Sequence, residues 1–228
     1  MFDTLNPRWE LASKQKLTWL NQKKAIELLL ISYLGGVQLV PGDANGTYPS
    51  GNSLLITGSS ETVIIDPSVT VAAAGGVDLP VDAIINSHAH EDHLAGNATF
   101  PDARVHIHGD DLYGAQSIDG MLDGYGLVGQ ARDDFREALL TEFHYSPRPD
   151  AHVFQDGHVW DLGGVTIEAV HLPGHTAGHS GFRISGGVFF LSDIDLTGFG
   201  PYYGDVFSSL DDFEESLIRV RDEEADHY

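Results

Sequence analysis

Nine short apolar runs, separated by turn residues, recur along the chain after Gly51. Each run has the length and pattern of a β-strand, and Gly, Pro, Asp or Ser stands between neighbouring runs. Several neighbours are joined by connections of hairpin length, which favours mixed sheets over a purely parallel doubly wound sheet. The pattern predicts an α/β domain whose strands lie in NSLLITG, TVIID, DAIINSH, RVHIHG, HVFQDG, HVWDLGG, VTIEAVHL, GFRISGG and VFFLSD.

Two stretches have helical spacing: one interrupts the series of strands, and the other follows the last strand. Residues 112–143 carry apolar side chains at helical spacing, and we expect them either to lie over the functional site or to pack on the sheets. Residues 210–224 have the pattern of an amphipathic helix, with Ser209 or Asp211 as its N-cap. The order of elements is therefore strands, helical insertion, strands and helix.

The N-terminal segment differs from the rest of the chain in charge. Its first 24 residues contain five basic and two acidic residues, a net charge of +3, and include all four lysines of the chain. The remaining 204 residues contain seven arginines and 32 acidic residues, a net charge of −25. Because the segment also has helical spacing, we expect residues 1–34 to form a helical extension attached to a domain of residues 35–228.

This acidity restricts the partners and the location of the protein. A strongly negative surface repels nucleic acid and anionic membranes, and salt screens its self-repulsion. The missing lysines suggest adaptation to a high-salt cytoplasm, which we state as a hypothesis. The best apolar stretch, residues 25–40, contains Glu27 and two glycines, and no convincing export signal is present. We therefore expect a soluble cytoplasmic protein that acts on a small molecule.

Metal-ligating residue types are concentrated in INSHAHEDHLAGN, residues 85–97. His88 and His90 are two positions apart at the exit of a predicted strand, so both side chains can converge on one ion. The chain has no cysteine, so nitrogen and oxygen atoms must hold any metal. Asp92 and His93 are adjacent, and only one of them easily joins the first ion. Their spacing therefore suggests a second ion beside the first.

Two later stretches supply further ligands. HLPGHTAGHSG places His175 in a turn after a strand, where its side chain can reach a neighbouring loop. VFFLSD places Asp193 at the end of a buried apolar strand, where a carboxylate is costly unless it is paired or binds a metal. We interpret His179 as a hydrogen-bonding support of its loop, and His171 as either a packing or a supporting residue.

Taken in this order, HAHEDH, PGHTAGH and FFLSD resemble the metallo-β-lactamase-fold hydrolases, and the resemblance covers residues 52–228. It implies an αβ/βα four-layer sandwich of two mixed β-sheets flanked by helices. It also implies that Asp66 supports the metal loop and that Asp193 bridges two ions. In the implied ligand set, His88, His90 and His175 hold the first ion, and Asp92, His93 and Asp193 hold the second.

The resemblance implies a binuclear hydrolase. Two Zn²⁺ ions, or iron or manganese in their place, would present a bridging hydroxide to an ester, thioester, lactone or phosphodiester, and Asp92 would orient it and accept its proton. One alternative is a mono-iron enzyme like the persulfide dioxygenases, which would use His88, His175 and Asp193. The other is a degenerate member that binds metal without catalysis.

Three further expectations accompany this resemblance, and the first of them is a departure from the family pattern. The family has a further histidine at the end of a strand after the helix of residues 210–224, and we expect this chain, ending at Tyr228, to lack that strand and to be truncated. Glu91 is expected to be a solvent-facing spacer. A glyoxalase-like thioesterase remains an option, although basic residues that would grip the carboxylates of glutathione are scarce.

Overall fold

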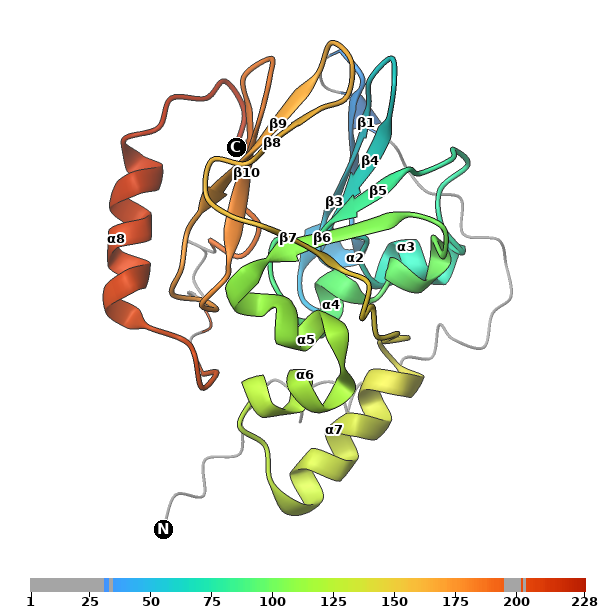
Figure 1. Cartoon of the computed structure of the whole chain (residues 1–228), viewed down its shortest axis with the longest axis vertical. Coiled ribbons are helices and arrows are strands. Elements are labelled where there is room, and N and C mark those ends of the chain that lie inside the picture. Colours follow the sequence, from blue (N-terminus) through green and yellow to red (C-terminus); the bar gives the residue numbers. More distant parts are fainter. Residues whose placement is uncertain (1–30, 33–34, 195–201, 203) are drawn as a thin grey trace.

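The computed structural model describes residues 31–32, 35–194, 202 and 204–228. Two β-sheets pack face to face, and helices cover the outer face of each (Figure 1), as expected from the sequence. Most of the expected N-terminal helical extension lies outside the described residues. Ile31 and Ser32, which its pattern included, instead pair with Leu39 and Gln38 as a short antiparallel strand.

The first sheet has seven strands in the order β1-β2-β3-β4-β5-β6-β7 and is mixed. Strands β1 to β4 pair antiparallel, whereas β4 to β7 pair parallel. The parallel half directs the carboxyl ends of β5 and β6 to one edge, which becomes the edge of the site. The strands are β1 Ile31–Ser32, β2 Val37–Val40, β3 Ser53–Thr57, β4 Thr62–Ile65, β5 Ala83–Ile85, β6 Arg104–His108 and β7 His152–Phe154.

The second sheet has four antiparallel strands in the order β11-β10-β9-β8. They are β8 Val159–Asp161, β9 Thr166–His171, β10 Ser180–Ile184 and β11 Val188–Phe190. A parallel bridge joins Val188 at the start of β11 to His227. Because Asp193 follows the opposite end of β11, His227 lies away from the predicted ligands.

The strands of the first sheet are apolar on both faces because both faces are covered. Leu54 and Ile56 point into the core between the sheets, whereas Leu55 points to the outer face. In β4, Ile65 faces the inner core and Ile64 the outer cluster. This alternation follows from the two-residue period of a strand and explains why the runs read as continuously apolar.

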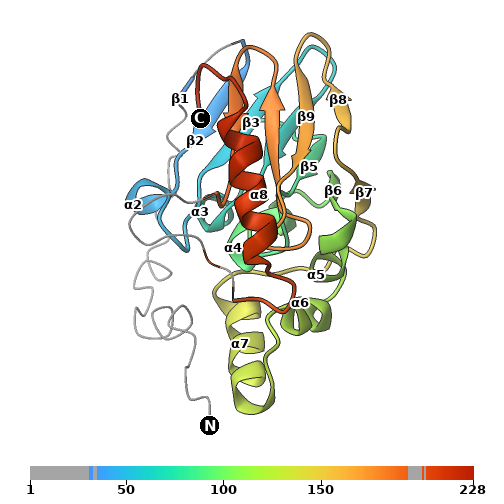
Figure 2. The ribbon, with the colours of Figure 1, turned by 90° about the vertical axis from the view of Figure 1, so that its left-hand side faces the viewer.

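The helices complete the outer layers. Phe213 of α8 packs on Val170 and Phe189 of the second sheet, and Figure 2 shows α8 lying across that sheet. Ser209 is the N-cap of α8, as predicted, and its hydroxyl accepts a hydrogen bond from the Asp212 backbone. The α-helices are α2 Asp43–Gly46, α3 Val69–Ala74, α4 Glu91–Leu94, α5 Leu112–Gln116, α6 Ile118–Gly124, α7 Gly129–Thr141 and α8 Leu210–Arg221, and the 3₁₀ helices are η2 Asn97–Thr99 and η3 Gly109–Asp111.

The insertion of residues 112–143 folds into α5, α6 and α7 below the sheets (Figure 1). Met121, Leu122 and Leu139 form its own apolar cluster, which also includes Ala89 of the loop after β5. The insertion therefore packs against the site edge rather than standing apart from it. Across the described ranges, no helix combines the length and apolar character that crossing a bilayer would require.

Candidate metal centre

The six predicted ligands gather at one edge of the sandwich. The loop after β5 carries the first two histidines, α4 carries the adjacent aspartate and histidine, the turn between β9 and β10 carries the next histidine, and the last aspartate follows β11. Exposed fractions are 0–4% for His88, His90, Asp92, His93 and His175, and 24% for the side chain of Asp193. Polar groups buried to this extent require hydrogen-bonding, ionic or metal partners.

Three imidazole nitrogens of the first predicted group face one another. His88 Nε2 lies 3.0 Å from His90 Nδ1 and 3.2 Å from His175 Nε2, and His90 Nδ1 lies 3.0 Å from His175 Nε2. Hydrogen bonds can join such nitrogens only where one of them carries a proton. The protonation of each ring therefore decides whether the three nitrogens form hydrogen bonds with one another or can together bind a metal ion.

The opposite nitrogen of each ring is held as a hydrogen-bond donor. His175 Nδ1 donates to the Tyr202 carbonyl at 2.6 Å, and His90 Nε2 donates to Asp205 Oδ2 at 2.5 Å. Ser87 donates its hydroxyl proton to Asp66 at 2.6 Å, so its oxygen accepts from His88 Nδ1 at 2.8 Å. In neutral rings these bonds leave three lone pairs directed at one another, which is the arrangement of a metal site.

The triangle has the size that a metal ion requires. A point roughly 2.0–2.1 Å from all three nitrogens, the usual zinc–nitrogen distance, lies about 1 Å outside their plane. Burial, followed by the charges of His93, His90 and His175, lowers the pKa of His88 well below its ordinary value. The ring is therefore neutral, as a metal ligand must be, and the donor set fits a divalent cation.

Asp193 stands between the two predicted groups. One of its carboxylate oxygens lies 3.2 Å from His175 Nε2, and the other lies 3.1 Å from His93 Nε2. Its side chain, with His88, His90 and His175, forms a cluster whose ligand atoms all lie within 4.8 Å of one another. This position fits a carboxylate shared by two ions.

His93 is surrounded by carboxylates. Its Nδ1 lies 3.0 Å from Asp66, and its Nε2 lies 3.1 Å from Asp193 and 3.6 Å from Asp92. Burial lowers the pKa of His93, but the charges of Asp193, Asp92 and Asp66 outweigh it and raise the pKa well above its ordinary value. Positive charge is thus favoured at Nε2, where either a proton or a cation can supply it.

Asp66 anchors the loop, as the resemblance implied. Besides its contact with His93, it accepts hydrogen bonds from the Ser87 amide at 2.7 Å and from Ser192 at 3.1 Å. Its backbone is in the left-handed region, with φ of 48°, a conformation that costs energy for a residue other than glycine. It ties the loop after β5 to the segment after β11.

A second anchor, Asp111, was missed by sequence reasoning. Its carboxylate accepts from the Ala89 amide at 2.9 Å, from the Thr176 hydroxyl at 2.6 Å and from the Gly178 amide at 2.8 Å. It therefore fixes the loop of His88 and His90 to the loop of His175. No local pattern marks it, because the donors come from segments far away in the chain.

His179 supports its loop by hydrogen bonding, as predicted. Its Nδ1 donates to the Leu172 carbonyl at 2.9 Å, and its Nε2 accepts from the Asp193 amide at 3.2 Å. Burial, followed by the charge of His175, lowers the pKa of His179 to about 3, so the ring stays neutral and can accept that bond. His179 thus positions the backbone of Asp193.

The prediction that Glu91 faces solvent is wrong. Its side chain is buried and accepts hydrogen bonds from the hydroxyls of Tyr48, at 2.9 Å, and of Tyr125. Helix α4 begins at Glu91, so the chain turns there and directs the side chain toward the insertion. The ring of Tyr125 stacks on His90, with centroids 5.3 Å apart. The insertion consequently contributes directly to the surroundings of the ligands.

A second group of potential ligands, His108, Asp110 and His171, does not fit one ion. The two imidazole rings are stacked, with centroids 4.1 Å apart and planes only 12° from parallel. A metal lies near the plane of each ring that binds it, and nearly parallel planes do not meet close by. His171 instead stacks on His108 and donates from Nε2 to the Ala177 carbonyl at 2.8 Å, so it takes part in both packing and hydrogen bonding.

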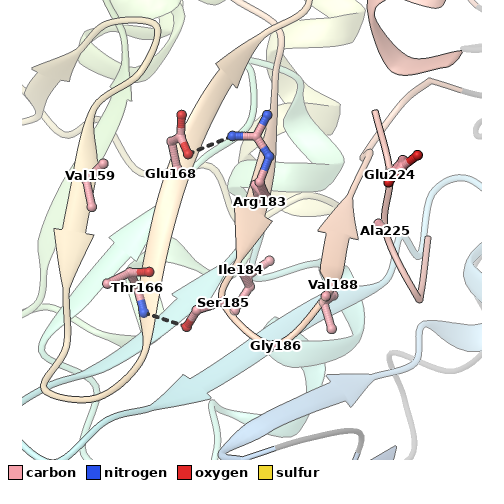
Figure 3. A pocket seen from close by; sticks show the side chains of 11 residues that line it. Val159, Thr166, Glu168, Arg183, Ile184, Ser185, Gly186, Val188, Glu224 and Ala225 are labelled. Atoms are coloured by element: carbon pink, nitrogen blue, oxygen red, sulfur yellow. Dashed lines mark hydrogen bonds and ion pairs between the residues drawn. The ribbon is translucent and has the colours of Figure 1, made fainter. Parts of the chain in front are cut away.

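Tyr202 lies near the predicted ligands, with ring centroids 6.0 Å from His90 and 6.1 Å from His175. A pocket of about 270 Å³ lies elsewhere, on the second sheet near the C-terminal segment (Figure 3). It is lined by Glu168 and Arg183 among others and includes none of the predicted ligands.

The fold and the ligand cluster agree with the comparison to known families. Residues 46–226 match the family model described as "Metallo-beta-lactamase superfamily". This match spans most of the chain, and the chain belongs to that superfamily.

Two curated relatives carry the same function in their names. The chain is 24% identical over 198 residues to hydroxyacylglutathione hydrolase GloC of Haemophilus influenzae, which covers 82% of this chain and 86% of that protein. It is also 24% identical over 178 residues to hydroxyacylglutathione hydrolase of Aeromonas salmonicida, covering 74% of this chain but only 56% of that protein.

Solved structures show the same fold. A metallo-beta-lactamase family protein of Thermus thermophilus superposes with a TM-score of 0.64 at 22% identity, covering 84% of this chain and 71% of that chain. The protein TTHA1623, solved in a di-iron-bound form, superposes with a TM-score of 0.52 at 22% identity, covering 86% and 85%.

Proposed function

We propose that this protein is a metal-dependent hydrolase that cleaves an ester, thioester or lactone, or a phosphodiester, of a small molecule. The observation that carries the proposal is the convergence of three imidazole nitrogens, each within 3.2 Å of the other two, with the Asp193 carboxylate beside them. Histidine and carboxylate ligands accept zinc, and they also accept iron or manganese. We expect two ions, zinc in the first instance.

The six ligand residues divide between the two ions by their distances. His88, His90 and His175 would hold the first ion, because their nitrogens form one triangle. The second would lie near His93 Nε2 and Asp92, with Asp193 contributing to both. Bound divalent cations lower the pKa of a coordinated water to near neutrality and polarise the scissile carbonyl or phosphoryl group.

Asp92 is the proposed proton acceptor. Its carboxylate is 3% exposed and lies 3.6 Å from His93 Nε2, at the side of the cluster shared with Asp193. A carboxylate held here orients the attacking water and takes its proton. Glu91, Asp111 and His179 hold the surrounding loops still, so the geometry does not have to form during the reaction.

The relatives support a thioester as one substrate type. Both curated relatives are named hydroxyacylglutathione hydrolases, and such an enzyme cleaves a thioester bond. Because both relatives are only 24% identical to this chain, they support the reaction class more strongly than they support the particular substrate. The superposition on a di-iron-bound protein makes iron a reasonable alternative to zinc.

A substitution series tests the proposal. Purified metal-loaded protein is assayed against an aryl ester, a thioester, a lactone and a phosphodiester. We expect Asp92→Asn to lower kcat by about 100-fold or more on any accepted substrate, and His88→Ala to abolish turnover. The exposed Asp102→Asn serves as the control and should retain full activity. Unchanged rates in Asp92→Asn and His88→Ala would refute the proposal.

Metal analysis separates the two alternatives. One iron per chain, together with oxygen consumption in the presence of a persulfide, would favour a mono-iron dioxygenase that uses His88, His175 and Asp193. Bound metal with no turnover of any tested class would favour a binding protein of the same fold.

A further inference from the structure

Every arginine that the structure describes is already paired with a carboxylate. The shortest nitrogen–oxygen distance in each pairing is between 2.5 and 3.0 Å. No lysine occurs after residue 24, and the basic residues of the N-terminal segment lie outside the described residues. The pairings are Arg104 with Glu61, Arg132 with Asp123, Arg136 with Asp119, Arg148 with Asp150, Arg183 with Glu168, Arg219 with Asp156 and Arg221 with Asp222.

Arg104 and Arg183 also lie away from the ligand edge. Arg104 begins β6, whereas the site lies beyond the other end of that strand. Arg183 belongs to the pocket on the second sheet, where Figure 3 shows its guanidinium beside Glu168, and it also pairs with Glu223. A substrate carboxylate at the metal centre would therefore meet no uncommitted cation from the described residues.

The surroundings of the ligands are themselves acidic. Six carboxylates belong to the cluster or contact its loops, and two divalent ions would carry only four positive charges. A loaded centre thus has no positive excess with which to attract an anion. The six carboxylates are Asp66, Glu91, Asp92, Asp111, Asp193 and Asp205.

The neighbouring side chains are apolar or aromatic. Tyr125 stacks on His90, and Tyr202 lies near both His90 and His175. Val206 and Phe207 directly follow Asp205, which bonds to His90, and they are 60% and 48% exposed. Exposed apolar side chains beside a buried polar cluster suit an apolar part of a ligand.

These observations bear on the kind of substrate that the centre accepts. A glutathione thioester carries two carboxylates and one ammonium group, and its recognition requires cations or well-placed donors. A neutral ester or thioester needs neither, and its apolar groups gain from contact with Tyr125, Val206 and Phe207.

We propose that the substrate of this centre is a neutral ester, thioester or lactone that has apolar substituents and carries no carboxylate. This inference rests on the proposed hydrolase function. It differs from what the names of the curated relatives suggest, because those enzymes act on a glutathione conjugate.

Matched substrate pairs test the inference on the full-length, metal-loaded protein. The first pair is S-lactoylglutathione and the lactoyl thioester of N-acetylcysteamine, which share the acyl group and differ in charge. The second is 4-nitrophenyl hydrogen succinate and 4-nitrophenyl butyrate, which share the leaving group. We expect kcat/KM to be at least about tenfold higher for the neutral member of each accepted pair.

The outcomes distinguish a failure of the substrate inference from a failure of the proposed hydrolase function. Equal or higher kcat/KM for the anionic members would overturn the inference and leave the hydrolase standing. No hydrolysis of either pair, of a lactone or of a phosphodiester would overturn the proposed function, and the inference with it.

A charge introduced beside the site gives a second readout. Val206→Lys places a cation next to Asp205, and Val206→Gln is a control of similar length without charge. We expect the lysine variant to raise kcat/KM for the anionic member relative to the neutral one by about threefold or more. The glutamine variant, which loses the same apolar side chain without gaining a charge, should raise that ratio by less than the lysine variant does. An unchanged ratio in the lysine variant would contradict the inference.

Ionic strength adds an independent measurement. Raising salt from about 0.05 to about 0.5 M shortens the screening length, so repulsion of an anionic substrate weakens. The kcat/KM ratio of anionic to neutral substrate should therefore increase severalfold with salt. A ratio that falls would indicate attraction of the anion and would overturn the inference.

Discussion

His90 Nε2 and Asp205 Oδ2 lie 2.5 Å apart, although 115 residues separate them in the chain. The segment around Asp205 holds a second imidazole as well, since the Tyr202 carbonyl accepts from His175. Ser208 completes the link by accepting from the Asp205 amide at 3.1 Å and donating to the His175 carbonyl at 2.7 Å. These contacts of Tyr202, Asp205 and Ser208 thus fix two of the three rings that face one another.

Removing the Asp205 charge should weaken metal binding. Asp205→Asn loses the carboxylate that orients His90 and raises its basicity, and such changes typically cost 10- to 100-fold in affinity, so we expect about tenfold or more. The measurement is competition with a chelator of known affinity. Asp211→Asn, at an exposed position of α8, is the matched control and should bind metal as the parent does. Equal affinity in both variants would show that Asp205 does not act through His90.

Asp111 should contribute strongly to stability. Asp111→Ala leaves the donors of Ala89, Thr176 and Gly178 without their carboxylate, and burying unsatisfied donors costs about 1–3 kcal/mol each at most. We expect a loss of about 3 kcal/mol in the free energy of unfolding, measured by denaturant titration. Asp110→Ala, at the neighbouring exposed position, should change it by less than about 0.5 kcal/mol. A loss below about 1 kcal/mol in Asp111→Ala would contradict this role.

Glu91 and Tyr125 should be energetically coupled. Their hydrogen bond joins α4 to the insertion, and Tyr48 donates to the same carboxylate. In a double-mutant cycle of Glu91→Gln and Tyr125→Phe, we expect an interaction energy of about 1 kcal/mol or more. Pairing Tyr125→Phe with Glu137→Gln, at an exposed position on α7, supplies a control cycle that should be additive. Additivity in the first cycle would mean that the bond stabilises nothing.

The stability of the protein should fall in acid through His106. Burial, followed by the charges of His152, Arg104 and His158, lowers the pKa of His106 from 6.5 to about 4. Between these two values the unfolded chain binds more protons at this residue than the folded one, so folded stability decreases as pH falls through that window. Allowing for partial exposure, we expect a loss of about 1–2 kcal/mol. Unfolding curves at about pH 5 and about pH 7.5 should show a smaller difference for His106→Leu than for the parent, and equal differences would be inconsistent with this pKa.

Salt should stabilise the folded chain if the charge of −25 on its last 204 residues reflects a high-salt setting. At about 1 M salt the screening length is about 3 Å, so repulsion among surface carboxylates is largely removed. We expect the melting temperature to rise steadily between about 0.1 and about 2 M KCl. No rise over this range would remove the support for salt adaptation.

The sequence predicted well what depends on local pattern. The nine strand runs formed strands because their apolar residues alternate between the inner core and the outer clusters, as Leu54 and Leu55 do. His88, His90, Asp92 and His93 could be singled out because they follow one strand within six positions. Strand β2 was not predicted, because its residues Val37–Val40 belong to a longer apolar stretch without a clear period.

What the sequence missed depends on contacts between distant segments. Nothing in the local sequence distinguishes Asp111 and Asp205 from the many other acidic residues, and only the fold brings them to Ala89 and His90. Glu91 was expected in solvent because it stands between predicted ligands in HAHEDH, yet the hydroxyls of two tyrosines from other segments donate to it. Asp66 and His179 could be anticipated because they lie within the motifs, whereas the contacts of Asp111, Asp205 and Glu91 leave no local spacing from which they could be found.

Elemental analysis of the purified full-length protein, after dialysis against metal-free buffer, tests the central claim most directly. The arrangement of His88, His90 and His175 with Asp92, His93 and Asp193 predicts two equivalents of divalent metal per chain, zinc or else iron or manganese. It also predicts that prolonged treatment with a strong chelator removes both ions together with the hydrolytic activity. A protein that binds no metal, and whose stability and activity do not respond to the chelator, would contradict the account.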